Sequence, residues 1–148
     1  AFNELLSASR ARVTLVVLDS CFSGGFSKDV ISAPGRMGLF SSHEDVTSGV
    51  ARKFRAGGYL AHFFVEAAGD GQADLDTDSQ ISAIELSQYL FERFRTDVKG
   101  GTGQEGYVLT GGPMMGYQHL IVDRGGVGPY DVLFRNVTRR PPTPPGAR

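Results

Sequence analysis

"VTLVVLDSCFSGGF", residues 13–26, is the stretch of sequence that decides the fold. Its branched apolar residues do not alternate with polar ones, which predicts a strand over residues 12–19 that is buried on both faces. The one cysteine of the chain, Cys21, follows this strand, and Gly24 and Gly25 mark a turn directly after it. Open α/β sheets bind ligands beyond the carboxyl ends of their strands, so Cys21 stands where a ligand is expected.

The rest of the chain predicts an α/β fold. We expect helices at residues 2–10, 59–68 and 83–95, and further strands at 37–42, 107–110, 119–123 and 130–134. Residues 23–36 are predicted to form a loop, and the Pro-rich residues 139–148 a disordered tail, which leaves 1–138 as the folded part. A strand buried on both faces needs neighbours on both edges, and few strands here can supply them. We therefore expect another polypeptide to complete the sheet.

The composition narrows the class of protein. The 148 residues suffice for one domain with a real core. A net charge of −1 gives no electrostatic footprint for nucleic acid or an anionic membrane surface. No apolar stretch approaches the roughly 20 residues of a membrane span. Because a lone cysteine forms no internal disulfide and suits a reducing compartment, we expect a cytoplasmic protein that binds neither nucleic acid nor membrane.

By position alone, Cys21 has two interpretations. It is either a nucleophile, with the backbone N–H groups of Gly24 and Gly25 approaching a substrate carbonyl, or a small buried hydrophobic residue. The motif favours the first, because "LDSCFSGGF" closely resembles the nucleophile segment of the caspase-like cysteine peptidases, in particular the metacaspases and bacterial caspase homologues. Their pattern is an apolar strand followed by Asp-x-Cys-x-Ser-Gly, which Asp19, Cys21 and the residues after it match.

The resemblance continues beyond the nucleophile. "LFSSHEDVTSGVA", residues 39–51, is similar to the strand and loop that follow the cysteine in metacaspases, down to Asp45, Thr47 and Ser48. In all, the resemblance covers roughly residues 3–135. It implies the caspase-like fold, a mostly parallel sheet between helices, of which this chain would be the C-terminal portion.

The resemblance also implies a cysteine–histidine dyad. In this family the base is a histidine upstream of the cysteine, and none of the 20 residues before Cys21 is a histidine. His43, His62 and His119 do not fit that position. A thiol with an ordinary pKa near 8.5 is a weak nucleophile without such a neighbour. We therefore expect a separate N-terminal fragment of the same precursor to supply the histidine.

Asp19 points to the specificity of such a peptidase. Metacaspases carry an aspartate two residues before the nucleophile, in the pocket for the residue that precedes the cut. A carboxylate there pairs with the guanidinium of arginine or the ammonium of lysine. The resemblance thus implies an endopeptidase that cleaves protein or peptide substrates after Arg or Lys. Asp19 has a second interpretation, as a strand-end cap bonded to nearby backbone.

Other site residues follow from the same resemblance. The backbone N–H of Cys21 would hold the oxyanion of the reaction. Strand 37–42 would pair with the substrate backbone, Ser41 and Ser42 would line the cleft, and Glu44 or Asp45 would add a second carboxylate to the pocket. No cofactor is required.

"DLDTDSQISAIE", residues 74–85, suggests a possible calcium site. Asp74, Asp76, Asp78 and Glu85 fall at positions 1, 3, 5 and 12 of the calcium-loop template, but Ser79 stands where the template wants Gly, and no clear entering helix precedes it. The alternative needs no metal: Ser82 and Glu85 form a capping box, and the aspartates make side-chain turns.

Two functions from different classes remain open. The first is the peptidase fragment, active only with its histidine-bearing partner. The second is a catalytically inactive caspase-like module that serves as a scaffold or interaction domain. Retention of both Cys21 and Asp19 favours the first, because a decayed site often loses one of them.

Overall fold

The structure is a computed structural model that describes residues 2–31, 33–45, 48, 50–51, 54–98, 107–108 and 116–141. Its centre is a sheet of three strands in the order β1-β2-β6, formed by Thr14–Leu18, Arg36–Phe40 and Ile121–Asp123. β1 runs parallel to β2, and β6 pairs with β2 in the antiparallel direction. The predicted strands at 12–19, 37–42 and 119–123 are therefore confirmed in slightly shorter form.

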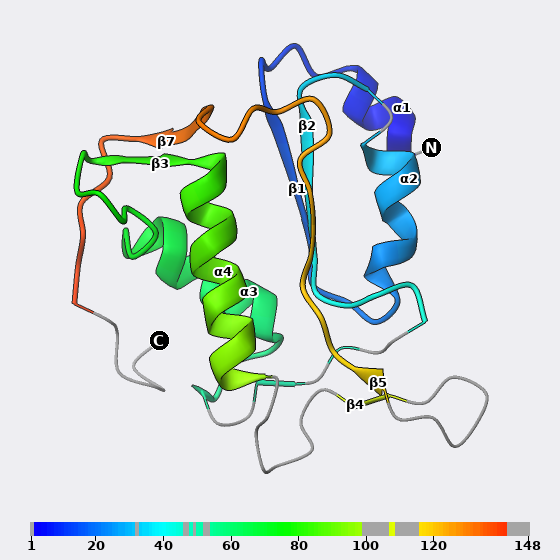
Figure 1. Ribbon diagram of the computed structural model, residues 1–148. Helices are drawn as coiled ribbons and strands as arrows, with labels where there is room; N and C mark the ends of the chain where they lie inside the picture. The colour runs from blue at the N-terminus through cyan, green and yellow to red at the C-terminus, as the bar shows by residue number, and fades with distance from the viewer. Residues whose placement is uncertain are drawn as a thin grey trace.

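Helices cover both faces of this sheet (Figure 1). The short helices α1 (Phe2–Ser7) and α2 (Ser27–Val30) lie on one face, and α3 (Tyr59–Phe64) and α4 (Ala83–Asp97) on the other. The chain is thus a mixed α/β fold. Within the described residues, no helix is long and apolar enough to cross a membrane.

The larger part of the core lies between the sheet and the helices α3 and α4. Met37 and Leu39 of β2 pack there with Phe63 of α3 and with Leu86 and Leu90 of α4, all with no exposed surface. Their spacing in α4 is that of one helical face, which is why the sequence predicted this helix. A smaller cluster on the opposite face joins β1 and β2 to the short helices.

β1 and β2 differ in how completely they are covered. All five residues of β2 are buried, whereas only Val16 of β1 is. Both faces of β1 do contact apolar side chains, with Leu15 and Val17 on the main core and Val16 and Leu18 on the smaller cluster. Among the described strands, however, β1 pairs with β2 alone. The prediction of a fully buried first strand is therefore only partly met, because one edge of β1 is open.

A second, separate pairing flanks α4. β3 (Gln80–Ser82) is antiparallel to β7 (Val132–Arg135), so the strand predicted at 130–134 forms but does not join the central sheet. The sequence did not predict β3. A further pair joins β4 (Tyr107–Val108) to β5 (Gly116–Tyr117).

Two predicted boundaries need correction. Residues 23–36 are not a plain loop, because a 3₁₀ turn, η1 (Ser23–Phe26), leads directly into α2. At the other end, the backbone N–H of Arg140 donates to the carbonyl of Asp70 at 2.9 Å, which attaches the start of the predicted tail to the folded part. Residues 142–148 lie outside the described residues.

Candidate active site

The candidate site lies where β1 and β2 end. Because the two strands are parallel, their carboxyl ends share one edge of the sheet. We call residues 19–26 the Cys21 turn, which follows β1. Ser41 and Ser42 follow β2, and the backbone N–H of Ser41 donates to the carbonyl of Leu18 at 3.0 Å. The sheet thus brings together two segments that the sequence analysis had marked separately.

Cys21 is exposed, so the interpretation as a buried hydrophobic residue is wrong. Its sulfur lies 3.4 Å from the backbone nitrogen of Ser48, which donates to it, and 4.0 Å from the Ser48 carbonyl oxygen. The side chain is therefore accessible and sits against a backbone donor.

The Cys21 turn has an unusual backbone. Phe22 has a φ of 59° and a ψ of 18°, in the left-handed region that residues other than glycine and asparagine seldom adopt. This conformation reverses the chain immediately after Cys21 and leads it into η1. Such strain, of order 1–2 kcal/mol, persists only where neighbouring contacts hold it.

Hydrogen bonds to the residues after β2 stabilise this strained conformation. The N–H of Gly24 donates to the Ser42 carbonyl at 2.8 Å, and the hydroxyl of Ser23 accepts from the Ser42 N–H at 3.3 Å. A side chain on Gly24 would place its Cβ 2.7 Å from the Ser42 oxygen. Gly25 donates to the Phe22 carbonyl at 3.2 Å. The expectation that the N–H groups of Gly24 and Gly25 face a substrate is therefore wrong, because both donate within the chain.

Three serines surround the peptide bond before Cys21. The hydroxyls of Ser41, Ser42 and Ser48 lie 3.2, 3.1 and 2.9 Å from the carbonyl oxygen of Ser20. We call these three residues the serine cluster. Ser41 and Ser42 have no exposed surface in this chain, so their side chains do not line a cleft as expected. β2 pairs with β1 on one edge and with β6 on the other, which leaves residues 38–40 no free edge for a substrate strand.

Asp19 lies against the beginning of α3. Its Oδ2 accepts from the backbone N–H of Ala61 at 2.8 Å, and a Cβ on Gly58 would overlap its carboxylate. Asp19 is thus bonded to backbone, as its second interpretation held, but it caps the start of α3 from a distant segment and not its own strand end. The other oxygen, Oδ1, is buried and has no hydrogen-bond partner among the described residues. One oxygen of the carboxylate is thus structural, and the other is not satisfied by the described part of the chain.

The histidines and the remaining acidic candidates lie in other surroundings. His62 stacks on Phe54, with ring centroids 4.5 Å apart, and its Nε2 lies 3.2 Å from Glu66. His119 is exposed at the end that precedes β6. Within the described part of the chain, the Cys21 sulfur contacts Ser48 and no imidazole.

Glu44 and Asp45 are both exposed. The Asp45 carboxylate lies 3.8 Å from Nδ1 of His43, and Glu44 lies against the Cys21 turn, with its Cβ 3.6 Å from where a Cβ on Gly25 would stand. His43, Glu44 and Asp45 form an acidic surface group next to the turn. Thr47 lies outside the described residues.

The acidic loop, residues 74–85, is tightly bonded within itself. Asp74 is buried, and its two carboxylate oxygens accept from the N–H groups of Asp78 and Ser79, each at 3.1 Å. Asp76 accepts from the Asp78 N–H at 3.1 Å, and Asp78 from the Gln80 N–H at 2.8 Å. The predicted side-chain turns are therefore present.

Glu85 completes the acidic loop. The Ser82–Glu85 capping box is formed, as predicted, and Glu85 also accepts from the Leu75 N–H at 3.1 Å. Partial burial raises the pKa of the Glu85 carboxyl, but hydrogen bonds from Ser82 and Leu75 together lower it more, so this pKa lies below its ordinary value.

The acidic loop also matches parts of the calcium template. Carboxylate oxygens of Asp74, Asp76 and Asp78 lie within 4.8 Å of one another. Ser79, at the glycine position, adopts the left-handed φ of 66° that the template requires there. A helix does precede the loop, because α3 continues as a π-helical turn, η3 (Val65–Gly69). Residues 70–73 separate this turn from Asp74, whereas the helix of the template leads directly into the loop.

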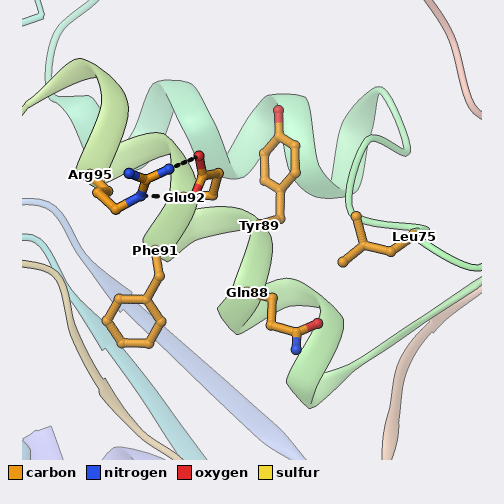
Figure 2. A pocket seen from close by; sticks show the side chains of 6 residues that line it. All are labelled: Leu75, Gln88, Tyr89, Phe91, Glu92 and Arg95. Atoms are coloured by element: carbon orange, nitrogen blue, oxygen red, sulfur yellow. Dashed lines mark hydrogen bonds and ion pairs between the residues drawn. The ribbon is translucent and has the colours of Figure 1, made fainter.

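A shallow hollow of about 510 Å³ lies along α4 and is bordered by Leu75 of the acidic loop (Figure 2). Its polar members are engaged: Glu92 and Arg95 form an exposed ion pair at 2.6 Å, and the Tyr89 hydroxyl donates to Glu66 at 3.1 Å. Burial, together with the Glu66 carboxylate, raises the pKa of Tyr89. These residues show no arrangement for acid–base or nucleophilic chemistry.

Comparison with known proteins gave no further guide. Neither the family models, nor the curated proteins, nor the solved structures included a match to this chain.

Proposed function

We propose that this chain is the nucleophile-bearing part of a caspase-like cysteine endopeptidase, cleaving after Arg or Lys together with a histidine-bearing segment of the same precursor. The observation that carries the proposal is the Cys21 turn at the open edge of the sheet. There an exposed thiol follows a buried carboxylate oxygen of Asp19 by two residues, and the backbone N–H of Ser48 donates to the sulfur.

The open edge of β1 supports the need for a second segment. A strand with apolar contacts on both faces and only one paired edge has unused backbone hydrogen-bonding groups that another strand can pair with. A strand added there would run beside β1 and end near Cys21. That is where an imidazole would have to stand in order to take the thiol proton.

The proposed reaction is acyl transfer to sulfur. The imidazole takes the Cys21 proton, the thiolate attacks the scissile carbonyl, and the C–N bond breaks as the imidazolium protonates the leaving amine. Water, deprotonated by the same imidazole, then attacks the thioester and releases the carboxylic acid and the thiol. The Cys21 N–H would donate to the oxyanion in both steps.

Asp19 supports the preference for a basic residue before the cut. Its Oδ1 is buried and unpartnered, and a buried carboxylate oxygen is costly unless it meets a donor or a positive charge. A guanidinium or ammonium group meets that need, whereas an aspartate side chain would repel it. The Ala61 N–H, bonded to Oδ2, fixes the carboxylate in place.

The test is hydrolysis of fluorogenic peptides by the intact precursor. We expect release from peptides ending in Arg or Lys, none above background from the matched Asp peptide, and none at all from the Cys21→Ala precursor. Ser87→Ala, in a hydroxyl-to-carbonyl bond within α4, is the matched control and should retain full activity. Equal signals from wild type and Cys21→Ala would instead favour the inactive scaffold.

A second candidate function concerns the acidic loop. We propose that it binds calcium through Asp74, Asp76 and Asp78, with Glu85 at the twelfth position of the template. The observation that favours this function is the left-handed Ser79 at the position reserved for glycine, together with the close approach of the three carboxylates. The ion would supply charge balance to the loop and would have no part in peptide hydrolysis.

A further inference from the structure

Three hydroxyls of the serine cluster lie within hydrogen-bond distance of the Ser20 carbonyl oxygen, which is more than this oxygen can accept from at full strength. A carbonyl oxygen has two lone pairs, and the Ser42 and Ser48 hydroxyls, at 3.1 and 2.9 Å, can fill both. The Ser41 hydroxyl lies 2.6 Å from that of Ser48 and 3.2 Å from the Ser20 oxygen. Since a hydroxyl has one hydrogen, Ser41 donates either to the Ser20 oxygen or to the Ser48 hydroxyl. In the second case it strengthens the bond that Ser48 donates to the Ser20 oxygen.

The peptide bond that accepts these hydrogen bonds is also the one that carries the Cys21 N–H. No peptide bond among the described residues is cis, so the Ser20 carbonyl and the Cys21 N–H point in opposite directions. The carbonyl faces the serine cluster, and the N–H faces away from it. Within the described part of the chain, no group accepts a hydrogen bond from that N–H.

Donors on a carbonyl change the amide on the other side of the peptide bond. They draw electron density from the nitrogen through the resonance of the peptide group, so the N–H becomes more positive and a stronger donor. Two or three donors also fix the plane of the peptide, and with it the direction of the N–H. Both effects matter most for an N–H that stabilises charge only in a transition state.

We propose that Ser41, Ser42 and Ser48 are positioning residues that orient and polarise the Ser20–Cys21 peptide, so that the Cys21 N–H becomes a strong oxyanion donor. The inference rests on the proposed function and deepens it. Ser48 contributes twice, because its hydroxyl binds the Ser20 carbonyl and its backbone N–H contacts the Cys21 sulfur. Ser41 and Ser42, fully buried, hold their hydroxyls in a dry environment where hydrogen bonds are stronger.

The polarisation can be measured without any activity. Labelling serine with ¹³C at the carbonyl and cysteine with ¹⁵N leaves one labelled peptide bond, Ser20–Cys21, because the chain has a single cysteine. An HNCO spectrum of the 148-residue chain therefore contains one signal. We expect Ser48→Ala to move both the Ser20 carbonyl carbon and the Cys21 amide proton to lower frequency, and Ser48→Thr, which keeps a hydroxyl, to restore them.

The two buried serines and a distant one complete the series. Ser42→Ala should shift the signal in the same direction as Ser48→Ala, and Ser41→Ala by less, because its hydroxyl is the most distant donor. Ser87→Ala removes a comparable bond, to the Ala83 carbonyl, and should not move the signal. If the Ser41 or Ser42 variant fails to fold, the HNCO signal of Ser48→Ala still tests the proposal, because Ser48 is only half-buried. An unmoved signal in Ser48→Ala overturns the proposal, whatever the activity.

The catalytic part is tested on the intact precursor with the Arg peptide. We expect Ser48→Ala to lower kcat by about 2- to 10-fold with KM unchanged, well short of the roughly 100-fold loss when an oxyanion donor itself is removed. A shifted signal with unchanged kcat would overturn the catalytic role of the serine cluster. An inactive wild-type precursor would overturn the proposed function itself, and the HNCO signal would still report the polarisation separately.

Discussion

The Cys21 turn and the acidic loop are both rich in Asp and Ser, yet they use their polar groups in opposite ways. In the acidic loop every acidic side chain accepts from a backbone N–H of the same loop. In the Cys21 turn the sulfur is exposed, one oxygen of Asp19 has no partner, and the Cys21 N–H has no acceptor among the described residues.

This difference separates a self-contained region from an incomplete one. Unpartnered buried polar groups are costly, so a fold retains them where a ligand or a second chain meets them. The acidic loop has its carboxylates and both flanking helices inside the chain. The calcium site proposed there can therefore be tested on the chain alone, whereas the activity proposed for the Cys21 turn has to be tested on the proposed precursor. Each change considered next should affect one of the two regions and leave the other unchanged.

The largest expected effect is that of Asp19→Asn on specificity. Asparagine keeps an oxygen for the Ala61 N–H, so α3 stays capped, but it removes the charge that would meet Arg or Lys. Loss of one partner of a buried charge pair costs at least about 2 kcal/mol, which corresponds to a fall of about 30-fold in kcat/KM for the Arg peptide. The melting temperature should stay within about 2 °C of wild type. Unchanged selectivity would confine Asp19 to its capping role.

Calcium should have the next largest effect, and only on the acidic loop. At 100 times its dissociation constant, a bound ion stabilises the folded state by about 2.7 kcal/mol, which raises the melting temperature by about 5–10 °C. We expect this rise in the chain alone, its loss in Asp76→Ala, and no rise with potassium at equal ionic strength. An equal rise in Asp76→Ala would place the ion elsewhere.

Gly24→Ala should break the Cys21 turn, and Gly25→Ala should not. The new Cβ would stand 2.7 Å from the Ser42 carbonyl oxygen, which is backbone and moves little, whereas at Gly25 the nearest atom is 3.6 Å away. We expect Gly24→Ala to lower the free energy of unfolding by about 1–3 kcal/mol and Gly25→Ala by less than about 0.5. Urea unfolding of the two variants, side by side, measures the difference.

The smallest expected effect is on the stability of the chain at low pH. The pKa of Glu85 is lower in the folded chain than its ordinary value of 4.5, so the unfolded chain binds the proton more tightly. The contribution of Glu85 to stability is therefore present above about pH 4.5 and is lost as the pH falls through the folded-state pKa. We expect Glu85→Gln to weaken the dependence of the melting temperature on pH between pH 6 and 3. Glu92→Gln should change this dependence less, because Glu92 is on the surface. Parallel curves for wild type and Glu85→Gln would contradict this.

The sequence predicted those parts of the fold and site that depend on local pattern. The apolar run of β1, the helical spacing of Leu86 and Leu90, and the S-x-x-E capping box are each contained in a few consecutive residues. β3 was missed because Gln80–Ser82 is short and polar and takes its partner, β7, from 50 residues further along the chain.

The site shows the same limit. The motif identified Cys21 and Asp19, and the structure supports an accessible thiol. Ser41 and Ser42 were expected to line a cleft but are buried, and only the parallel pairing of β1 and β2 shows that their hydroxyls meet the Ser20 carbonyl. No spacing rule places Asp19 over Gly58, since that contact joins segments some 40 residues apart.

Covalent trapping tests whether Cys21 is a nucleophile that the precursor activates and directs to Arg. The precursor and the isolated chain are incubated with a peptidyl chloromethyl ketone ending in Arg, with the Asp-ended ketone as the matched reagent, and the adducts are mapped by mass spectrometry. We expect one adduct, on Cys21, formed rapidly in the precursor with the Arg reagent and only at the rate of a free thiol in the isolated chain. Equal rates in the two proteins, or no preference for Arg, would contradict it.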